Sequence, residues 1–197
     1  MRRRLTLRTA AIAAALVEVG LLLGIAIYLA VADRALVIAF PRRDELRTGA
    51  DAGLTIPVAG VRTEELKDTY GAARSGGRAH KGVDIFAARG TPVLAAAAGV
   101  IVNRDSNAVG GLSLYHRGMD GRTIYYYAHL DGIRAGLKVG DLVRAGDTLG
   151  YVGSTGNVSG SPHLHFAVFT VADPNRWWRG RDLNPYDLLT ESAPGIR

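Results

Sequence analysis

Residues 113–130 read SLYHRGMDGRTIYYYAHL, two apolar runs joined around Asp120-Gly121. An Asp-Gly pair between runs rich in β-branched and aromatic residues is a strong signal for a β-hairpin. Similar runs, separated by Gly, Asp, Asn and Pro, extend outward from it; they are TIPVAGV at 55–61, VDIF at 83–86, PVLAAAAGVIV at 92–102, DLVRAGDTLGYVG at 141–153 and HLHFAVF at 163–169. Helical periodicity is scarce, so the sequence predicts a mainly β fold of antiparallel sheet. One short closing helix is expected after Asn184, with Pro185 in its first turn.

The composition excludes several classes of protein before any motif is considered. The chain of 197 residues is 48% hydrophobic and 21% charged, which is too apolar for an intrinsically disordered protein and long enough for one core-forming domain. It contains no Cys, which excludes a disulfide framework, a thiolate zinc site, an iron-sulfur cluster and a cysteine nucleophile. A metal ion in this protein must therefore bind to His, Asp or Glu side chains.

The net charge of +6 does not point to nucleic acid. Residues 1–32 hold four Arg against one Glu, so half of the excess belongs to the amino terminus and three positive charges remain on the other 165 residues. No basic stripe or aromatic-basic motif follows in the sequence. We therefore expect no nucleic-acid partner.

The amino terminus has the pattern of a membrane anchor. Residues 10–32 form an apolar run of 23 residues in which Glu18 is the only charge. A helix of this length covers about 34 Å, enough to cross a hydrocarbon core of about 30 Å. Four Arg precede the run, so the positive-inside rule predicts a single-pass transmembrane signal anchor whose basic N-terminus, residues 1–9, lies in the cytoplasm. The rest of the chain is then extracytoplasmic.

A second interpretation of the same run remains open. Ala30-Val31-Ala32 is an Ala-x-Ala pattern that a signal peptidase could cut, and an apolar core starting at Val19 would have 14 residues. The full run exceeds the usual signal-peptide core of about 7–15 residues, which favours the anchor, whereas the charge of Glu18 favours cleavage. Both interpretations export the chain from residue 33 onward.

Beyond the apolar run, we predict three regions. Residues 33–53 are mixed, charged and interrupted by Pro and Gly, as in a stalk or linker. The short apolar runs lie within residues 54–190, which we interpret as one folded domain. Residues 191–197 are then a C-terminal tail.

Short motifs place His and Asp side chains on predicted strands. His163 and His165 are two residues apart, so on a strand both side chains leave from the same face. His80 and Asp84 are four apart in HKGVD, where Gly and a β-branched residue disfavour a helix, and an extended segment again puts them on one side. His129 lies near the end of the run TIYYYAHL, in phase with the first and third Tyr of that run. Three strand ends could therefore converge.

These residue types suit a catalytic zinc site. Such a site commonly has two His and one carboxylate as ligands and keeps its fourth position for water. His80, Asp84 and one member of the His163/His165 pair would satisfy that count. The other member of the pair and His129 would then be free to accept a proton and to stabilise a developing oxyanion. No HExxH motif occurs, so in a peptidase His rather than Glu must act as the base.

The motifs, taken as a set, resemble one family. HKGVD at 80–84, YYAHL at 126–130, GSTGN at 153–157 and SPHLHF at 161–166 resemble the lysostaphin-like, LytM-type zinc metallopeptidases, which cut peptides of bacterial cell-wall peptidoglycan. The resemblance covers about residues 56–189. It implies an antiparallel β-sheet peptidase domain of the duplicated hybrid motif fold, with the metal in a groove between loops. Carried over residue by residue, it implies one Zn²⁺ bound by His80, Asp84 and His165, and His129 and His163 as the catalytic pair.

The function implied by this resemblance is zinc-dependent hydrolysis of peptide cross-links in peptidoglycan. Its substrates would be peptidoglycan stem peptides, and its place of action the periplasmic side of the bacterial cytoplasmic (inner) membrane, with an envelope regulator as a further candidate partner. The alternative is a noncatalytic LytM-type envelope module that binds the wall or activates another wall hydrolase. Relatives of that kind have lost ligands, whereas this sequence retains all five positions. A membrane-tethered structural or secretion component is a third class.

Three features lie outside this interpretation. His116 exceeds the number of ligands and bases that the site needs, so we expect it to be structural. Trp177 and Trp178 could form a patch that faces the wall or the membrane, or could pack on the edge of the domain. Arg74, ahead of the HKGVD motif, also resembles a family feature, and we interpret it as structural.

Overall fold

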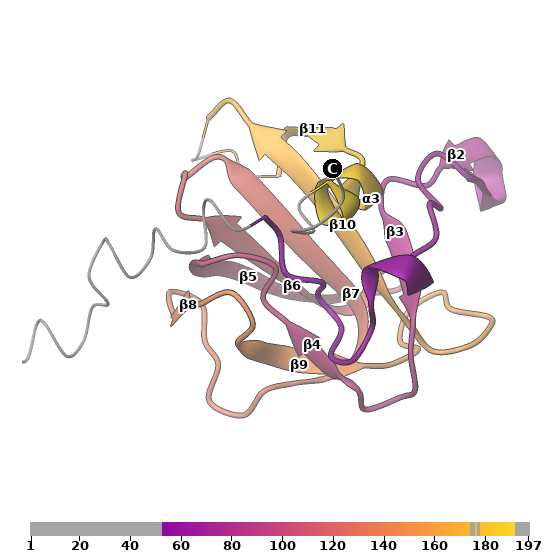
Figure 1. Cartoon of the computed structure of the whole chain (residues 1–197), viewed down its shortest axis with the longest axis horizontal. Helices are drawn as coiled ribbons and strands as arrows, with labels where there is room; N and C mark the ends of the chain where they lie inside the picture. The colour runs from indigo at the N-terminus through magenta and orange to yellow at the C-terminus, as the bar shows by residue number, and fades with distance from the viewer. Residues whose placement is uncertain (1–52, 174–175, 177, 192–197) are drawn as a thin grey trace, which may run out of the picture. The chain divides into compact units, whose positions relative to one another are not determined.

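The computed structural model describes residues 53–173, 176 and 178–191 (Figure 1). Within these residues, a nine-stranded sheet forms the body of the domain, and all of its strand pairs are antiparallel. A two-stranded hairpin and one short α-helix accompany it. The expected mainly β antiparallel fold is confirmed.

Along the part of the chain that the structure describes, the elements follow one another without a long helix. Their order is η1 (Thr63–Glu65), β1 (Ala73–Arg74), η2 (Ser75–Gly77), β2 (Arg78–Ala79), β3 (Val83–Phe86), β4 (Pro92–Leu94), β5 (Gly99–Asn107), β6 (Gly111–Gly118), β7 (Thr123–Ile133), β8 (Leu142–Val143), β9 (Thr148–Val152), β10 (His163–Val171), β11 (Gly180–Leu183) and α3 (Pro185–Thr190). The main path of the sheet runs β11-β10-β7-β6-β5-β8. β3 pairs with β10, β9 pairs with β7, and β4 pairs with β9.

The hairpin predicted around Asp120-Gly121 is present as β6 and β7. Gly121 adopts a φ of 74°, which is costly for residues with a Cβ, and its N–H donates to the carbonyl of Gly118 at 2.9 Å. Asp120 tightens the turn by accepting hydrogen bonds from the backbone of Arg122 and Thr123. The Asp-Gly pair therefore specifies this turn.

The closing helix α3 is also confirmed. The side chain of Asn184 accepts a hydrogen bond from the N–H of Tyr186 at 3.0 Å, as an N-cap residue does. Pro185 occupies the first turn, where its missing N–H has no intrahelical partner to lose. Leu189, on this helix, is buried in the core.

Strand register brings the motif residues together. β10 lies between β3 and β7 in the sheet, so His165 faces Asp84 on one side and Ala128 on the other. One residue further along β10, Phe166 faces Tyr127, and both aromatic rings are completely buried. Because side chains alternate along a strand, the core and the face that carries His165 are opposite faces of these strands.

His116 is a core residue, as its excess over the required count of ligands predicts. The side chain is completely buried, with its ring next to Tyr125 and Tyr127. The Tyr127 hydroxyl accepts the N–H of Ala96 and lies 3.2 Å from His116 Nδ1, so its proton is free to be donated to that nitrogen. His116 Nε2 has no hydrogen-bond partner among the described residues. Burial lowers the pKa of His116 to about 4, so the folded protein holds this side chain neutral.

We predict that His116 makes the fold sensitive to acid. An unfolded His binds a proton near pH 6.5, whereas the folded side chain does so only near pH 4, so stability is lost as the pH falls between these values. The expected loss from this residue is about 3 kcal/mol. Urea unfolding at pH 7 and pH 4.5, with excess chelator so that metal release does not contribute, should show a smaller pH dependence in His116→Leu. An equal pH dependence in the two proteins would contradict the assignment.

Several sequence predictions lie outside the described residues. They are the basic N-terminus (1–9), the anchor (10–32), the stalk up to residue 52, the tail from residue 192 and Trp177. Among the residues that are described, no helix has both the length and the apolar character to cross a membrane.

Candidate metal centre

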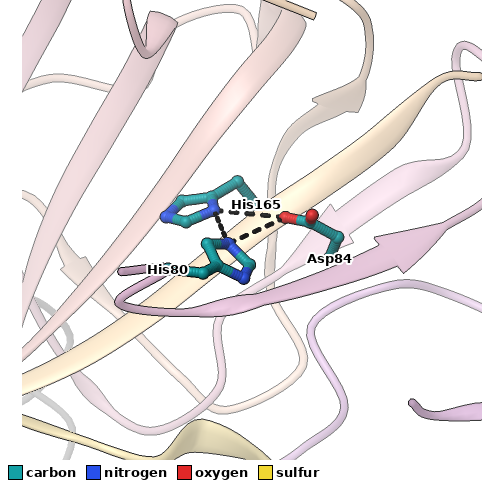
Figure 2. Close-up of side chains that lie close together, drawn as sticks. All are labelled: His80, Asp84 and His165. Atoms are coloured by element: carbon teal, nitrogen blue, oxygen red, sulfur yellow. Dashed lines mark hydrogen bonds and ion pairs between the residues drawn. The ribbon is translucent and has the colours of Figure 1, made fainter. Parts of the chain in front are cut away.

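Three side chains from separate parts of the chain point at one another (Figure 2). His80 lies between β2 and β3, Asp84 is on β3 and His165 is on β10. His80 Nε2 is 2.8 Å from His165 Nδ1 and 3.1 Å from Asp84 Oδ1, and His165 Nδ1 is 3.2 Å from the same oxygen. His80 and Asp84 are buried, and His165 is nearly so.

This donor set fits a zinc ion. Zinc prefers imidazole nitrogen and carboxylate oxygen at about 2.0–2.2 Å in a tetrahedral arrangement, in which neighbouring ligand atoms are about 3.3 Å apart. The three atoms of the protein are separated by 2.8–3.2 Å, so only a small expansion separates them from that arrangement. His80, Asp84 and His165 can therefore hold one metal ion through three protein ligands.

Neighbouring groups orient these candidate ligands. His80 Nδ1 donates to the carbonyl of Thr69 at 2.7 Å, which leaves the lone pair on Nε2 facing the other two side chains. The hydroxyl of the same Thr69 accepts the N–H of Asp84 at 3.0 Å. Arg74 donates from Nη2 to Asp84 Oδ2, so Oδ1 is left for the centre. Arg74 thus contacts a candidate ligand directly, which the purely structural interpretation of this residue did not anticipate.

Gly82 makes room for the His165 ring. A Cβ at Gly82 would lie 2.5 Å from the carbonyl oxygen of Phe166 and 2.9 Å from Cε1 of His165. The Gly in HKGVD is therefore required for close approach of β3 to β10.

The electrostatics favour an ionised Asp84 carboxylate beside a neutral His165 imidazole. Burial opposes ionisation of Asp84, but hydrogen bonds with His165, His80 and Arg74 outweigh it and hold the pKa of Asp84 well below its usual range. Burial lowers the pKa of His165, although its hydrogen bond with Asp84 acts in the opposite direction. A charged carboxylate and neutral imidazole are the forms that bind a metal.

His129 and His163 lie beside this triad. The ring centroid of His129 is 5.1 Å from that of His163 and 5.8 Å from that of His165. His163 Nε2 is 3.8 Å from Asp84 Oδ1, and its Nδ1 donates to the carbonyl of Ser161 at 2.9 Å. The structure therefore brings together all five residues that the sequence selected.

His129 reaches the centre by a route that strand alternation does not predict. The sequence placed it in phase with Tyr127, whose ring is in the core, but His129 has a φ of 63°, a rare conformation for a residue with a Cβ. This turns its side chain away from the core, towards His163 and His165. Its N–H donates to the carbonyl of Gly110 at 2.8 Å.

Thr155, in the GSTGN motif, holds His129 in this position. Its carbonyl accepts from His129 Nδ1 at 2.8 Å, which leaves the Nε2 lone pair free. Its hydroxyl donates to the carbonyl of Leu130 at 2.8 Å and accepts the N–H of Leu112 at 2.9 Å. Burial lowers the pKa of His129 to about 4 and the neighbouring His rings add to this effect, while the Thr155 carbonyl opposes it. At neutral pH the His129 ring is uncharged.

Sequence reasoning missed the roles of Thr69, Arg74 and Thr155. Thr69 and Thr155 contact the site residues through their backbone carbonyls. Arg74 contacts Asp84, which is 10 residues further along the chain. No spacing rule identifies such contacts. The only available signal was that Arg74 and Thr155 lie in or near motifs of the family that the sequence resembles.

We predict that Arg74 strengthens metal binding. Replacing it with Met removes the donor to Asp84 Oδ2 and should weaken zinc affinity about 10- to 100-fold, the usual effect of losing a group that orients a ligand. Competition with a chromophoric chelator measures this directly. Arg74→Lys should recover part of the affinity, and Arg134→Met, at an exposed turn position, should leave it unchanged. Equal affinity in Arg74→Met and the unmodified protein would contradict the prediction.

Comparison with known proteins supports one family. Residues 78–185 match the family model described as Peptidase family M23. An L-Ala--D-Glu endopeptidase of Bacillus subtilis is 36% identical over 138 residues, which are 66% of this chain and 41% of the relative. Lysostaphin of Staphylococcus staphylolyticus is 45% identical over 91 residues, 46% of this chain and 18% of the relative. The chain thus spans less than half the length of these curated relatives.

Among solved structures, the catalytic domain of lysostaphin from Staphylococcus simulans superimposes with a TM-score of 0.51 at 34% identity. The match covers 61% of this chain and 90% of that domain. The matched family model covers more than half of the chain and contains the three candidate metal ligands together with His129 and His163. The resemblance found in the sequence is confirmed, and the chain belongs to peptidase family M23.

Proposed function

We propose that this protein is a zinc-dependent endopeptidase that hydrolyses peptide cross-links of bacterial cell-wall peptidoglycan. The observation that carries the proposal is the meeting of two His and one Asp as a three-ligand set with two further His beside it. Membership of family M23 supports the substrate class, as does the name of one relative, a peptidoglycan DD-endopeptidase of Vibrio cholerae that is 40% identical over 89 residues. The noncatalytic alternative loses its usual basis, because none of the five positions is replaced.

We assign His80, Asp84 and His165 as ligands of one Zn²⁺ per chain, and His129 and His163 as catalytic residues. When bound, zinc supplies Lewis-acid polarisation of a carbonyl and of a water molecule. His129 and His163 divide two tasks, accepting a proton from the attacking water and donating a hydrogen bond to the oxyanion of the peptide. The Thr155 and Ser161 carbonyls hold the Nδ1 protons of this pair, so a neutral ring can accept the proton of the water at Nε2. The ring that donates to the oxyanion must carry a second proton, on its own Nε2.

The test uses the full chain purified in detergent. About one zinc ion per chain, together with release of uncross-linked peptides from isolated sacculi, is the expected result. Chelation should abolish release and added zinc should restore it. Zinc affinity should fall with acidification, because protons compete for the His ligands. Zinc binding without release of any wall peptide, from sacculi of either direct or bridged cross-linking, would overturn the endopeptidase assignment.

We also propose that residues 10–32 hold the enzyme at the outer face of the cytoplasmic membrane. The support is the apolar run and the Arg cluster that precedes it. Intact mass and membrane fractionation of the expressed protein separate the two interpretations of this run. An uncleaved chain in the membrane fraction supports the anchor, and a mature chain that begins after Ala32 would identify a cleaved signal.

A further inference from the structure

We infer that a pocket beside the metal centre selects a substrate residue that carries a free carboxylate next to the scissile bond, and that Lys67 recognises this carboxylate. The inference rests on the proposed endopeptidase function and specifies its substrate. It addresses which kind of peptide bond the enzyme cuts.

The pocket adjoins the residues assigned to catalysis. It has a volume of about 300 Å³, and its walls are β3 on one side and η1 with the residues that follow it on the other. Asp84 lines it, and Oδ1 of the same residue faces the metal centre. Phe86 lines it as well, with its ring centroid 5.3 Å from that of His163. A peptide bond held at the centre therefore places a flanking residue at this pocket.

Part of the pocket wall is apolar and can contact an aliphatic side chain. Val61, Leu66 and Ile85 contribute apolar surface, and Phe86 is 54% exposed although it is a large hydrophobic residue. An exposed aromatic side chain at the edge of a catalytic site commonly contacts substrate. A glycine residue has no side chain to fill this volume, so the pocket favours a longer residue.

The charged residues of the pocket lining are Glu65, Lys67 and Asp84, and Asp84 is paired with Arg74. Among the described residues, Lys67 has no carboxylate within ion-pair distance, so its charge is uncompensated. Glu65, also in the lining, interacts with Arg62. Its Oε2 accepts a hydrogen bond from the Arg62 backbone N–H at 2.8 Å and lies 3.6 Å from Arg62 Nε. Asp68, the neighbour of Lys67, accepts a backbone N–H two residues further on. Lys67 is thus the available partner for a substrate carboxylate.

Peptidoglycan offers the two candidates in distinct chemical forms. In a direct cross-link through diaminopimelate, the carbon attached to the cross-linking amide nitrogen carries a free carboxylate and an aliphatic chain. A glycine bridge carries neither group along its length. The combination of Lys67, the apolar part of the wall and the contact with Asp84 therefore favours a bond that has a carboxylate on the carbon next to its amide nitrogen over a glycine bridge. The direct cross-link is such a bond, and the D-Glu residue of an L-Ala–D-Glu stem bond offers the same two groups.

The experiment compares two cross-linked peptide dimers that differ in one group, a free carboxylate or a carboxamide on the diaminopimelate next to the scissile bond. With the zinc-loaded full chain, kcat/KM should be about fivefold higher for the free carboxylate, mainly through KM, as expected for an exposed ion pair. Lys67→Met should abolish the difference by lowering only the rate on the free carboxylate. Lys67→Arg should preserve the difference, and Lys138→Met, at an exposed position outside the pocket lining, should leave both rates unchanged.

A binding measurement separates failure of this inference from failure of the proposed function. Calorimetric titration of the same two dimers into zinc-loaded His163→Ala should show the same preference, again removed by Lys67→Met. The inference would be overturned if the two dimers bound with equal affinity or if Lys67→Met affected both dimers equally. Cleavage of pentaglycine in preference to either dimer would also overturn it. In each case the protein would still be an active peptidase. If no peptide is cleaved, the proposed function fails, and the calorimetric comparison alone decides whether Lys67 binds the carboxylate.

Discussion

His165→Ala should lower bound zinc from about one ion per chain to almost none and reduce peptide release at least about a thousandfold. His165 Nδ1 lies 2.8 Å from His80 Nε2 and 3.2 Å from Asp84 Oδ1, so its removal leaves only two of the three assigned ligands. The loss of a metal that contributes several kcal/mol to the transition state accounts for the size of the effect. Zinc content by atomic absorption and peptide release from sacculi measure the two quantities on the same sample.

The isosteric replacement Asp84→Asn provides a second test of the same site. It retains the shape of the side chain but removes the charge that His80, His165 and Arg74 face, so zinc content should again collapse. Asp187→Asn, at an exposed position on α3, is the matched control and should keep both zinc and activity. A His165→Ala or Asp84→Asn protein that retains stoichiometric zinc would show that the ligand set has been assigned incorrectly.

His163→Ala should separate catalysis from metal binding. Its side chain is not one of the three assigned ligands, so zinc content should remain near one ion per chain. Turnover should fall about 10²- to 10⁴-fold, the range expected when a residue that transfers a proton is removed. Measurement of kcat on a soluble cross-linked dimer, together with zinc content, distinguishes this result from loss of the metal.

His129→Ala gives the companion measurement. If the two side chains share one proton-transfer and oxyanion-stabilising unit, the double variant should be little worse than either single variant. Effects that multiply would instead indicate independent roles. Full activity of His163→Ala would exclude it as a catalytic residue, whatever the behaviour of His129.

Much of the fold could be predicted from the sequence because its signals are local. The Asp120-Gly121 pair predicted the β6/β7 hairpin, and Asn184-Pro185 predicted α3, since each depends on backbone preferences within a few residues. The His-x-His spacing on β10 placed both imidazoles on one face for the same reason. Family resemblance, rather than spacing, then selected His165 over His163 as the expected ligand, and the structure places the Nδ1 atom of His165 against His80 and Asp84.

The arrangement around these residues was decided by tertiary structure. Sequence alternation assigned His129 to the face of Tyr127, and only the positive φ held by Gly110 and Thr155 turns it towards the other His residues. The orientation of Asp84 depends on Arg74, and the pocket that contains Lys67 depends on η1 packing beside β3.

The sequence by itself therefore determined which residue types are available, which strands and turns carry them, and that a metal in this chain must bind His or carboxylate. Tertiary structure alone decided which nitrogen of each imidazole faces the centre, which group orients Asp84 and which cation lies next to the site. The physical reason is that secondary-structure preferences act over a few neighbouring residues. Contacts such as His80 with His165, 85 residues apart in the chain, exist only after strand pairing has set the register.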